Sequence, residues 1–157
     1  MEYYQSPLGL LEVTSGRGQL TGCTFIGDRP GAPSCPDELT RLAIRQLEEY
    51  FAGRRFVFEL PFQVGRTAFQ KAVVNELLHI PFGDTITYAE LARRVHSPSG
   101  SRAAGGVISR NPLLIIIPCH RVVGQNGSLT GYAGGVELKQ WLISHEMNLV
   151  HPPGRLF

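Results

Sequence analysis

The stretch from Leu113 to Gly124 reads LLIIIPCHRVVG. Its five branched apolar residues lie between Pro112 and Pro118, which predicts a short, fully buried strand. A cysteine, a histidine and an arginine follow directly, so this strand would hold the Cys119 thiol at its end. Most free cysteines are simply small buried hydrophobes, and a purely structural role for Cys119 stays open at this point.

Length and composition are typical of a globular protein with one domain or two small ones. The chain has 157 residues, of which 43% are hydrophobic and 18% are charged. No apolar run approaches the roughly 20 residues of a membrane span, and the start MEYY has no signal-peptide character. We therefore expect no membrane association and a cytoplasmic location, or a nuclear one in a eukaryote. The three cysteines are too few for a disulfide framework, and we expect them to remain thiols.

Charge is distributed unevenly along the chain. The net charge is +2, but residues 91–136 contain five arginines and no acid, so this window carries +5 and the rest −3. A basic face on an otherwise acidic protein is expected where the partner is a polyanion. Neighbouring segments could also supply the missing acids, which would leave an ordinary solvated face.

The first part of the chain predicts a small α+β domain, residues 1–64. Runs 10–14 and 20–25 are β-prone and flank a Gly-containing hairpin turn, residues 39–51 keep helical spacing, and residues 55–60 alternate as a third strand would. A metal site on Cys23 and Cys35 would need further ligands, and no histidine lies nearby, so the sequence does not establish whether this part binds a metal. We interpret this domain as scaffold.

The second part, residues 65–157, predicts a helical domain. Thr67 with Gln70 and Thr87 with Glu90 form capping-box patterns that begin two helices. A helix from Thr87 to about residue 95, a tight connection, and a short helix over 101–109 predict a helix-turn-helix, giving a winged-helix-like DNA-binding domain.

The second helix of that motif has an unusually smooth centre. It contains Ala103-Ala104-Gly105-Gly106, and each glycine costs about 1 kcal/mol relative to alanine in a helix. Such a face suits close approach of the backbone to a DNA groove or to another helix. The long side chain at its start, Arg102, could enter the groove or the base stack, contact phosphate, or be an idle surface charge.

Beyond the cysteine, residues 124–135 are rich in glycine and lack acids, which favours a loop wrapped around a ligand over a packed element. A flexible surface connection is compatible with the same glycine content. The last helix, from Val136 to about residue 147, is expected to bury Leu138, Trp141 and Leu142. His145 shares that face by spacing, and Glu146 on its margin is a candidate to reach an inward-facing histidine.

From about Thr67 to Glu146 the chain resembles the O6-alkylguanine-DNA alkyltransferases, which repair DNA by direct reversal. The core of the resemblance is Pro118-Cys119-His120-Arg121-Val122, preceded by Asn111-Pro112. The other matching motifs, in the family's order, are Phe69-Gln70, Ile80-Pro81-Phe82-Gly83, Thr87-Tyr88, Arg102-Ala103, Gly131-Tyr132 and Gly134-Gly135. Val74 and Val107 depart from the family's usual residues, but neither touches the expected chemistry.

The resemblance implies a mechanism. Cys119 would accept the alkyl group from guanine O6, activated through a water by His120, which Glu146 would orient. Tyr88 would supply a proton to the departing guanine, and Asn111 would hold the backbone beside the active-site turn. No cofactor or metal is implied.

The resemblance also implies how DNA would be bound. The protein would act as a monomer on double-stranded DNA containing O6-alkylguanine, with no obligatory protein partner, and would flip the nucleotide out of the helix. The implied DNA-binding residues are Thr87, Arg102, Ala103, Ala104, Gly105 and Gly106. The implied pocket residues are Val122, Gly131, Tyr132 and Ala133. Because a thioether is not hydrolysed under mild conditions, each molecule would act once.

Three other functions remain compatible with the residues. A lesion sensor of the same fold would bind without repairing, but such proteins characteristically lack the acceptor cysteine that is present here. A cysteine hydrolase built on Cys119, His120 and Glu146 would turn over repeatedly. A plain helix-turn-helix regulator would not need the Cys119 thiol at all.

Overall fold

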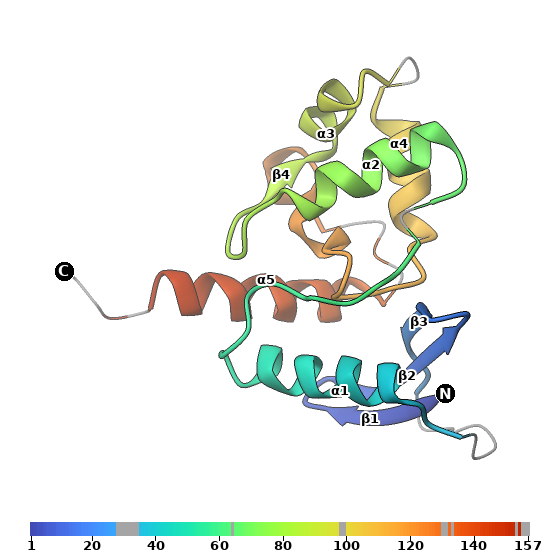
Figure 1. Cartoon of the computed structure of the whole chain (residues 1–157). Helices are drawn as coiled ribbons and strands as arrows, with labels where there is room; N and C mark the ends of the chain where they lie inside the picture. The colour runs from blue at the N-terminus through green and yellow to red at the C-terminus, as the bar shows by residue number, and fades with distance from the viewer. Residues whose placement is uncertain are drawn as a thin grey trace. The chain divides into compact units, whose positions relative to one another are not determined.

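The structure is a computed structural model that describes residues 1–27, 35–63, 65–97, 100–129, 132, 134–152 and 154. Its elements form two compact units (Figure 1). The first comprises Met1–Gln63 together with Pro112–Ile116, and the second comprises Val64–Asn111 together with Ile117–Phe157. The predicted α+β fold class is confirmed. The predicted domain boundary after residue 64 stays a prediction, and it does not anticipate that residues 112–116 group with the N-terminal unit.

The N-terminal unit is built on a three-stranded antiparallel sheet in the order β1-β2-β3. Its strands are β1 (Glu2–Ser6), β2 (Gly9–Gly16) and β3 (Gln19–Phe25). The β2–β3 hairpin turns on Arg17 and Gly18, whose φ angles of 54° and 74° are the two positive values that a tight two-residue loop needs. The strands predicted over residues 10–14 and 20–25 and the hairpin between them are confirmed, whereas β1 was not predicted.

Helix α1 (Glu38–Phe51) packs its apolar stripe against this sheet, which confirms the predicted helix. It begins at Asp37, whose carboxylate accepts from the Thr40 backbone N–H at 2.7 Å, while the Thr40 hydroxyl accepts from the Asp37 N–H at 3.0 Å. The buried apolar residues of the sheet and helix are Leu11, Val13, Leu20, Cys23, Ala43, Leu47 and Tyr50.

The strand predicted over residues 55–60 is wrong. These residues run without regular pairing, and the first bridge of this segment joins Phe62 to Leu20 of β3. The reason lies in Gln46 on α1, whose buried side-chain amide bonds both the N–H and the carbonyl of Glu59, at 2.9 and 3.2 Å. A side chain therefore takes the place that a neighbouring strand would have.

The C-terminal unit consists mainly of helices. They are α2 (Ala68–Leu78), α3 (Tyr88–Arg94), α4 (Ser101–Ser109) and α5 (Val136–Val150), with the short 3₁₀ turns η1 (Cys119–Arg121) and η2 (Gln125–Gly127). Strand β4 (Ile86–Thr87) pairs in parallel with β5 (Val122–Val123). Helices α3 and α4 form the predicted helix-turn-helix. No helix among the described residues combines the length and the apolar character needed to cross a bilayer.

The two predicted capping boxes have different outcomes. At α2 both halves form, since Thr67 Oγ1 accepts from the Gln70 N–H at 3.0 Å and Gln70 Oε1 accepts from the Thr67 N–H at 3.2 Å. At α3 the Thr87 hydroxyl caps the helix through the Glu90 N–H at 3.1 Å. The Glu90 carboxylate instead pairs with arginines on the same helix.

The stretch of branched residues before Cys119 is buried as predicted but is not a regular strand. Leu113 forms a single parallel bridge with Cys23, and the Leu114 N–H donates to the Cys23 carbonyl at 2.9 Å. The chain then turns sharply, because the Ile116 N–H bonds the Leu114 carbonyl at 2.8 Å around Ile115, which has a φ of 72°. This is a γ-turn with a β-branched residue in the left-handed region, a rare and strained conformation. The strand is cut short because the chain rejoins the C-terminal unit at residue 117.

Replacing Thr67 with alanine should destabilise α2, because the Gln70 N–H loses its acceptor. We expect T67A to lower the free energy of unfolding by about 1 kcal/mol. T67S retains the hydroxyl and should stay close to the wild type. Urea unfolding followed by circular dichroism compares the three proteins, and equal stability of T67A and T67S would contradict the role of the cap.

Candidate active site

The Cys119 thiol is held at the start of η1 and has no exposed surface. The backbone tightens just before it, where the Cys119 N–H donates to the Ile117 carbonyl at 2.7 Å around Pro118. The Asn111 side-chain amide donates to that same carbonyl at 3.1 Å and to Cys119 Sγ at 3.0 Å. Asn111 thus fixes the turn and the sulfur together, and it lies where the sequence predicts.

Burial governs the acidity of this thiol. It raises the pKa of Cys119 to about 11, although the hydrogen bond from Asn111 and the positive charge of Lys139 oppose the rise. Cys23, buried in the N-terminal unit, has a pKa raised to about 12. In this state Cys119 is a protonated thiol at neutral pH, so its reaction requires removal of a proton.

His120 follows directly and is completely buried. Its Nε2 lies 2.5 Å from Oε2 of Glu146 on α5, which places the predicted histidine–glutamate pair together. Burial lowers the pKa of His120, while the neighbouring Glu146 raises it, and the net shift is downward. A neutral ring beside a carboxylate carries its proton on Nε2, which leaves Nδ1 as an acceptor. This Nδ1 is buried and has no hydrogen-bond partner among the described residues.

Glu146 is the acid of the site. Burial alone would raise its pKa, but the hydrogen bonds of His120 and Arg121 and their positive charges, that of His120 only while its ring is protonated, outweigh burial and lower the pKa to about 2. The pKa of His120 is itself lowered, so its ring is neutral. The permanent positive charge beside Glu146 is therefore the guanidinium of Arg121. Its Nε donates to Glu146 Oε1 at 2.7 Å.

Lys139 was not predicted from the sequence. It lies on α5 with no exposed surface, and its Nζ is 3.4 Å from the Tyr88 hydroxyl and 5.4 Å from the centre of the Tyr88 ring. Burial lowers the pKa of Lys139, and the nearby Cys119 sulfur opposes this shift. Burial raises the pKa of Tyr88, and Cys119 adds to the rise. Cys119, Tyr88 and Lys139 therefore form one electrostatic cluster.

The buried face of α5 differs from the prediction. The residues that are fully buried are Lys139, Leu142 and Glu146, whereas Leu138, Trp141 and His145 are only partly buried. His145 stacks on Trp141, with ring centres 4.8 Å apart. Leu142 is buried as predicted, but Leu138 and Trp141 are not fully buried, because two of the three inward positions are taken by the charged residues Lys139 and Glu146. The i, i+3, i+7 spacing of Lys139, Leu142 and Glu146 was the available signal.

The predicted DNA-binding residues occupy different environments. Arg102 is exposed on the first turn of α4. Ala104 is fully buried inside the unit, so its position supports packing and not DNA contact. Ala103, Gly105 and Gly106 are partly exposed, as is Thr87.

The two glycines of α4 are not required by the packing of this unit. A Cβ added at Gly105 would meet the Tyr88 ring at an ordinary distance of 3.9 Å. At Gly106 the nearest atom would be the flexible end of Arg110 at 3.4 Å. The sequence left two reasons for this smooth helix face, close approach to a DNA groove or tight packing on another helix. The structure does not support tight packing at these two positions.

Pairing reduces the charge that the five arginines of the acid-free window present. Arg93 and Arg94 both pair with Glu90, and Arg121 pairs with Glu146 inside the unit. Arg102 and Arg110 are exposed. Of the five arginines in the window, the two without such a pairing among the described residues, Arg102 and Arg110, lie at the two ends of α4, so the basic surface is centred on this helix.

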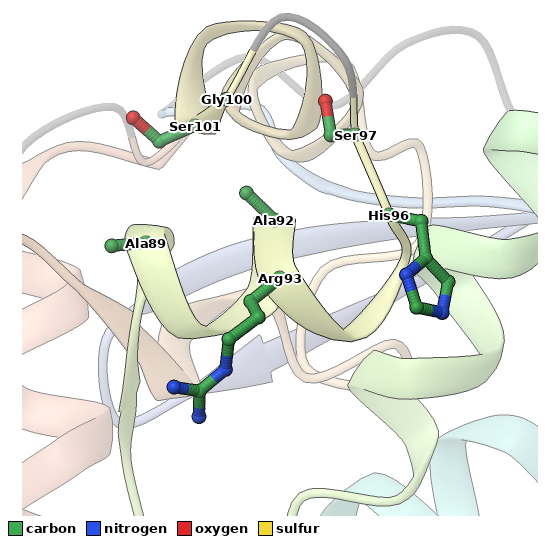
Figure 2. A pocket seen from close by; sticks show the side chains of 7 residues that line it. All are labelled: Ala89, Ala92, Arg93, His96, Ser97, Gly100 and Ser101. Atoms are coloured by element: carbon green, nitrogen blue, oxygen red, sulfur yellow. The ribbon is translucent and has the colours of Figure 1, made fainter.

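A surface hollow of about 420 Å³ lies beside the turn of the helix-turn-helix (Figure 2). It is lined by Ala89, Ala92, Arg93, His96, Ser97, Gly100 and Ser101. In Figure 2, Ala92 points toward the start of α4, whereas Arg93 projects from the other side of α3. None of the lining residues belongs to the Cys119 cluster, so this hollow is separate from the candidate active site.

The predicted pocket residues are described in part. Val122 is fully buried in β5, and Tyr132 is nearly so. Gly131 and Ala133 lie outside the described residues. Within the described part of the chain, no three His, Cys, Asp or Glu side chains gather as a metal site would require. The absence of a metal or cofactor stays a prediction.

Comparison with known proteins agrees with this geometry. Residues 68–148 match the family model "6-O-methylguanine DNA methyltransferase, DNA binding domain", and residues 1–64 match the "ribonuclease-like domain" of the same family. The chain belongs to this family. The N-terminal part, which the sequence motifs left as scaffold, is thus a domain of the family as well.

Similar proteins cover nearly the whole chain. The methylated-DNA–protein-cysteine methyltransferase of Methanosarcina acetivorans is 49% identical over 91% of this chain and 95% of its own. The O6-methylguanine methyltransferase of Mycobacterium tuberculosis has a TM-score of 0.82 and 34% identity, covering 93% of this chain and 91% of that one. A structure of the same bacterium's OGT in complex with DNA has a TM-score of 0.81 and 37% identity, covering 94% and 92%. The resemblance stated from the sequence motifs is confirmed.

Removing the charge of Lys139 should make Cys119 less reactive. Below the thiol pKa the thiolate fraction rises about tenfold per pH unit, so labelling of Cys119 by iodoacetamide should climb from pH 7 to pH 10 without a plateau. K139M should label more slowly at each pH, because a positive charge that favours the thiolate is gone.

Peptide mapping isolates the label on Cys119, and K71M, which removes an exposed lysine of α2, serves as control. A plateau near neutral pH in the wild type, or equal rates in K139M and K71M, would contradict this assignment.

Proposed function

We propose that this protein repairs DNA by transferring the alkyl group of O6-alkylguanine in double-stranded DNA to Cys119. In this proposal residues 65–157 bind DNA and accept the alkyl group, and residues 1–64 are scaffold. The observation that carries the proposal is the arrangement around Cys119. One unit joins a buried thiol, an acceptor nitrogen on His120 and a helix-turn-helix.

The reaction is a single displacement. A bond forms between Cys119 Sγ and the alkyl carbon as the bond from that carbon to guanine O6 breaks. The thiol proton passes by way of a water to Nδ1 of His120, and the imidazolium is stabilised by the Glu146 carboxylate. The guanine takes up the Tyr88 proton and leaves neutral, and the ammonium of Lys139 beside that hydroxyl stabilises the phenolate that remains.

Burial of Cys119 supports a flipped nucleotide. A sulfur with no exposed surface does not reach an atom inside a base pair, so the target nucleotide must leave the stack and enter the site. We assign Arg102, exposed at the start of α4, to the place that the flipped base vacates. The partly exposed Ala103, Gly105 and Gly106 would face the minor groove, and Thr87 would lie at the DNA interface.

The product is a thioether, which is stable to mild hydrolysis, so each protein molecule acts once. We propose a monomer that needs no cofactor and no protein partner and works in the cytoplasm, or in the nucleus of a eukaryote.

Mixing the protein with a duplex that bears one O6-methylguanine should add one methyl group to the peptide containing Cys119. Intact-mass measurement and peptide mapping detect the transfer, and C119A should gain nothing.

The same experiment separates the alternatives. Retention of the duplex without any gain of mass would indicate a lesion sensor, and release of product over many turnovers would indicate a hydrolase. If the protein neither binds the duplex nor takes up the methyl group, the proposed function is overturned.

Substituting Gly106 should separate stability from DNA binding. Alanine gains about 1 kcal/mol of helix propensity at this position, and the packing leaves room for its methyl group, so G106A should unfold at a higher temperature. The added methyl group should weaken DNA binding, because it stands between the helix backbone and the groove.

Asn148→Ala on the exposed end of α5 is the matched control, since it raises helix propensity away from the proposed interface. Thermal unfolding and fluorescence anisotropy with labelled duplex compare the three proteins. Higher stability with unchanged DNA affinity in G106A would contradict groove approach by α4.

A further inference from the structure

The Glu146 carboxylate is held by more than its histidine. Oε2 faces His120 Nε2 at 2.5 Å, whereas Oε1 accepts from Arg121 Nε at 2.7 Å and lies 3.4 Å from the Gly83 backbone N–H. Glu146 is 1% exposed, so protein donors must replace the water that a free carboxylate would have. Its two oxygens have separate partners, and only one of them is the histidine.

Arg121 also anchors the turn that precedes β4. A terminal guanidinium nitrogen donates to the Ile80 carbonyl at 2.7 Å, and the guanidinium carbon lies 5.6 Å from the centre of the Phe82 ring. Gly83 closes this turn with a φ of 89°, and a Cβ there would meet Val150 at 2.5 Å. One side chain therefore connects η1, α5 and the turn after α2.

We propose that Arg121 is a positioning residue: its guanidinium keeps Glu146 a carboxylate, and so fixes the ring proton of His120 on Nε2 and leaves Nδ1 free to take the thiol proton. The proposal rests on the proposed function for its catalytic meaning. It extends that function by giving the arginine beside the histidine a defined task.

The protonation state of Glu146 decides which residue donates the hydrogen bond between Glu146 and His120. A carboxylate can only accept, so it requires a proton on Nε2. A protonated carboxyl can donate, and the ring then carries its proton on Nδ1, where it no longer accepts one. A buried glutamate with only a neutral histidine as partner tends toward the protonated form, because burial penalises its charge. Arg121 favours the carboxylate whether or not the ring is charged, through its fixed charge and its hydrogen bond to Oε1.

Three charged groups act on the pKa of His120. Burial lowers its pKa most strongly, Glu146 raises it, and the positive charges of Arg121 and Lys139 lower it. Cys119 is its neighbour in the chain. Arg121 therefore acts twice, because it favours the charged form of Glu146 and disfavours the charged form of His120. Both effects leave the ring neutral with a defined tautomer before substrate arrives.

The test compares R121Q, which removes the charge, with R121K, which keeps the charge but offers one ammonium in place of a forked donor. F82L is the local control, because it alters the contact with the guanidinium without touching Glu146. Two readouts are taken on each full-length protein. Long-range proton–nitrogen NMR of the imidazole rings, assigned with H120Q, reports the tautomer, and single-turnover methyl transfer to Cys119 reports the rate from pH 5 to pH 9.

In the wild type, R121K and F82L we expect the His120 proton on Nε2. Protonation of Glu146 should not slow methyl transfer in these proteins between pH 5 and pH 9. In R121Q the pKa of Glu146 should rise, so its ionised fraction and the transfer rate should fall about tenfold for each pH unit below that raised value. The Nδ1 tautomer should appear over the same range. Reduced thermal stability without these two changes would be a structural effect only, and would overturn the proposal.

If R121Q does not fold, the wild type still decides. A proton on Nδ1 of His120 at neutral pH would overturn the proposal, and a proton on Nε2 that persists to pH 5 would support it. Methyl transfer by the wild type is scored separately. Its absence would count against the proposed function, while the tautomer measurement would still test the effect of Arg121 on the Glu146–His120 pair.

Discussion

The arrangement of the C-terminal unit depends on keeping one carboxylate charged inside protein. Glu146 has almost no contact with solvent, and a buried charge is tolerated only where partners replace its hydration. Its partners come from separate segments, since His120 and Arg121 lie on η1 and Gly83 lies in the turn before β4. The need to satisfy two oxygens thus fixes the positions of α5, η1 and that turn together.

The same dry interior keeps the cysteine unreactive until it is needed. A thiol with a pKa of about 11 is almost entirely protonated at neutral pH. Cys119 is therefore protected from oxidation and from non-specific modification, which both proceed through the thiolate. Asn111 and Lys139 each favour the thiolate, but burial prevails. Reactivity therefore has to come from a proton acceptor in the site, and His120 is the neutral base that adjoins it.

Features that depend on neighbouring residues in the sequence could be predicted, and features that depend on distant side chains could not. The Thr67–Gln70 capping box, the Arg17–Gly18 hairpin and the placement of Asn111 near Cys119 followed from local chemistry or from family motifs. The strand expected over residues 55–60 failed because Gln46, on another element, takes up the backbone groups of Glu59. Lys139 was missed because a charged residue on a buried helix face contradicts the hydrophobic pattern used to find that face.

The passage of Pro112–Ile116 through the N-terminal unit determines how the protein can be divided. A fragment beginning at residue 65 would keep these residues but lose β3, whose Cys23 backbone bonds Pro112 and Leu114. The side chains from Leu113 to Ile116 would then become exposed, at a cost on the order of 2 kcal/mol each. Such a fragment would be prone to aggregate just upstream of its own cysteine. The N-terminal sheet therefore covers a segment that leads directly to the reactive cysteine, so a cut at residue 65 would divide a packed unit.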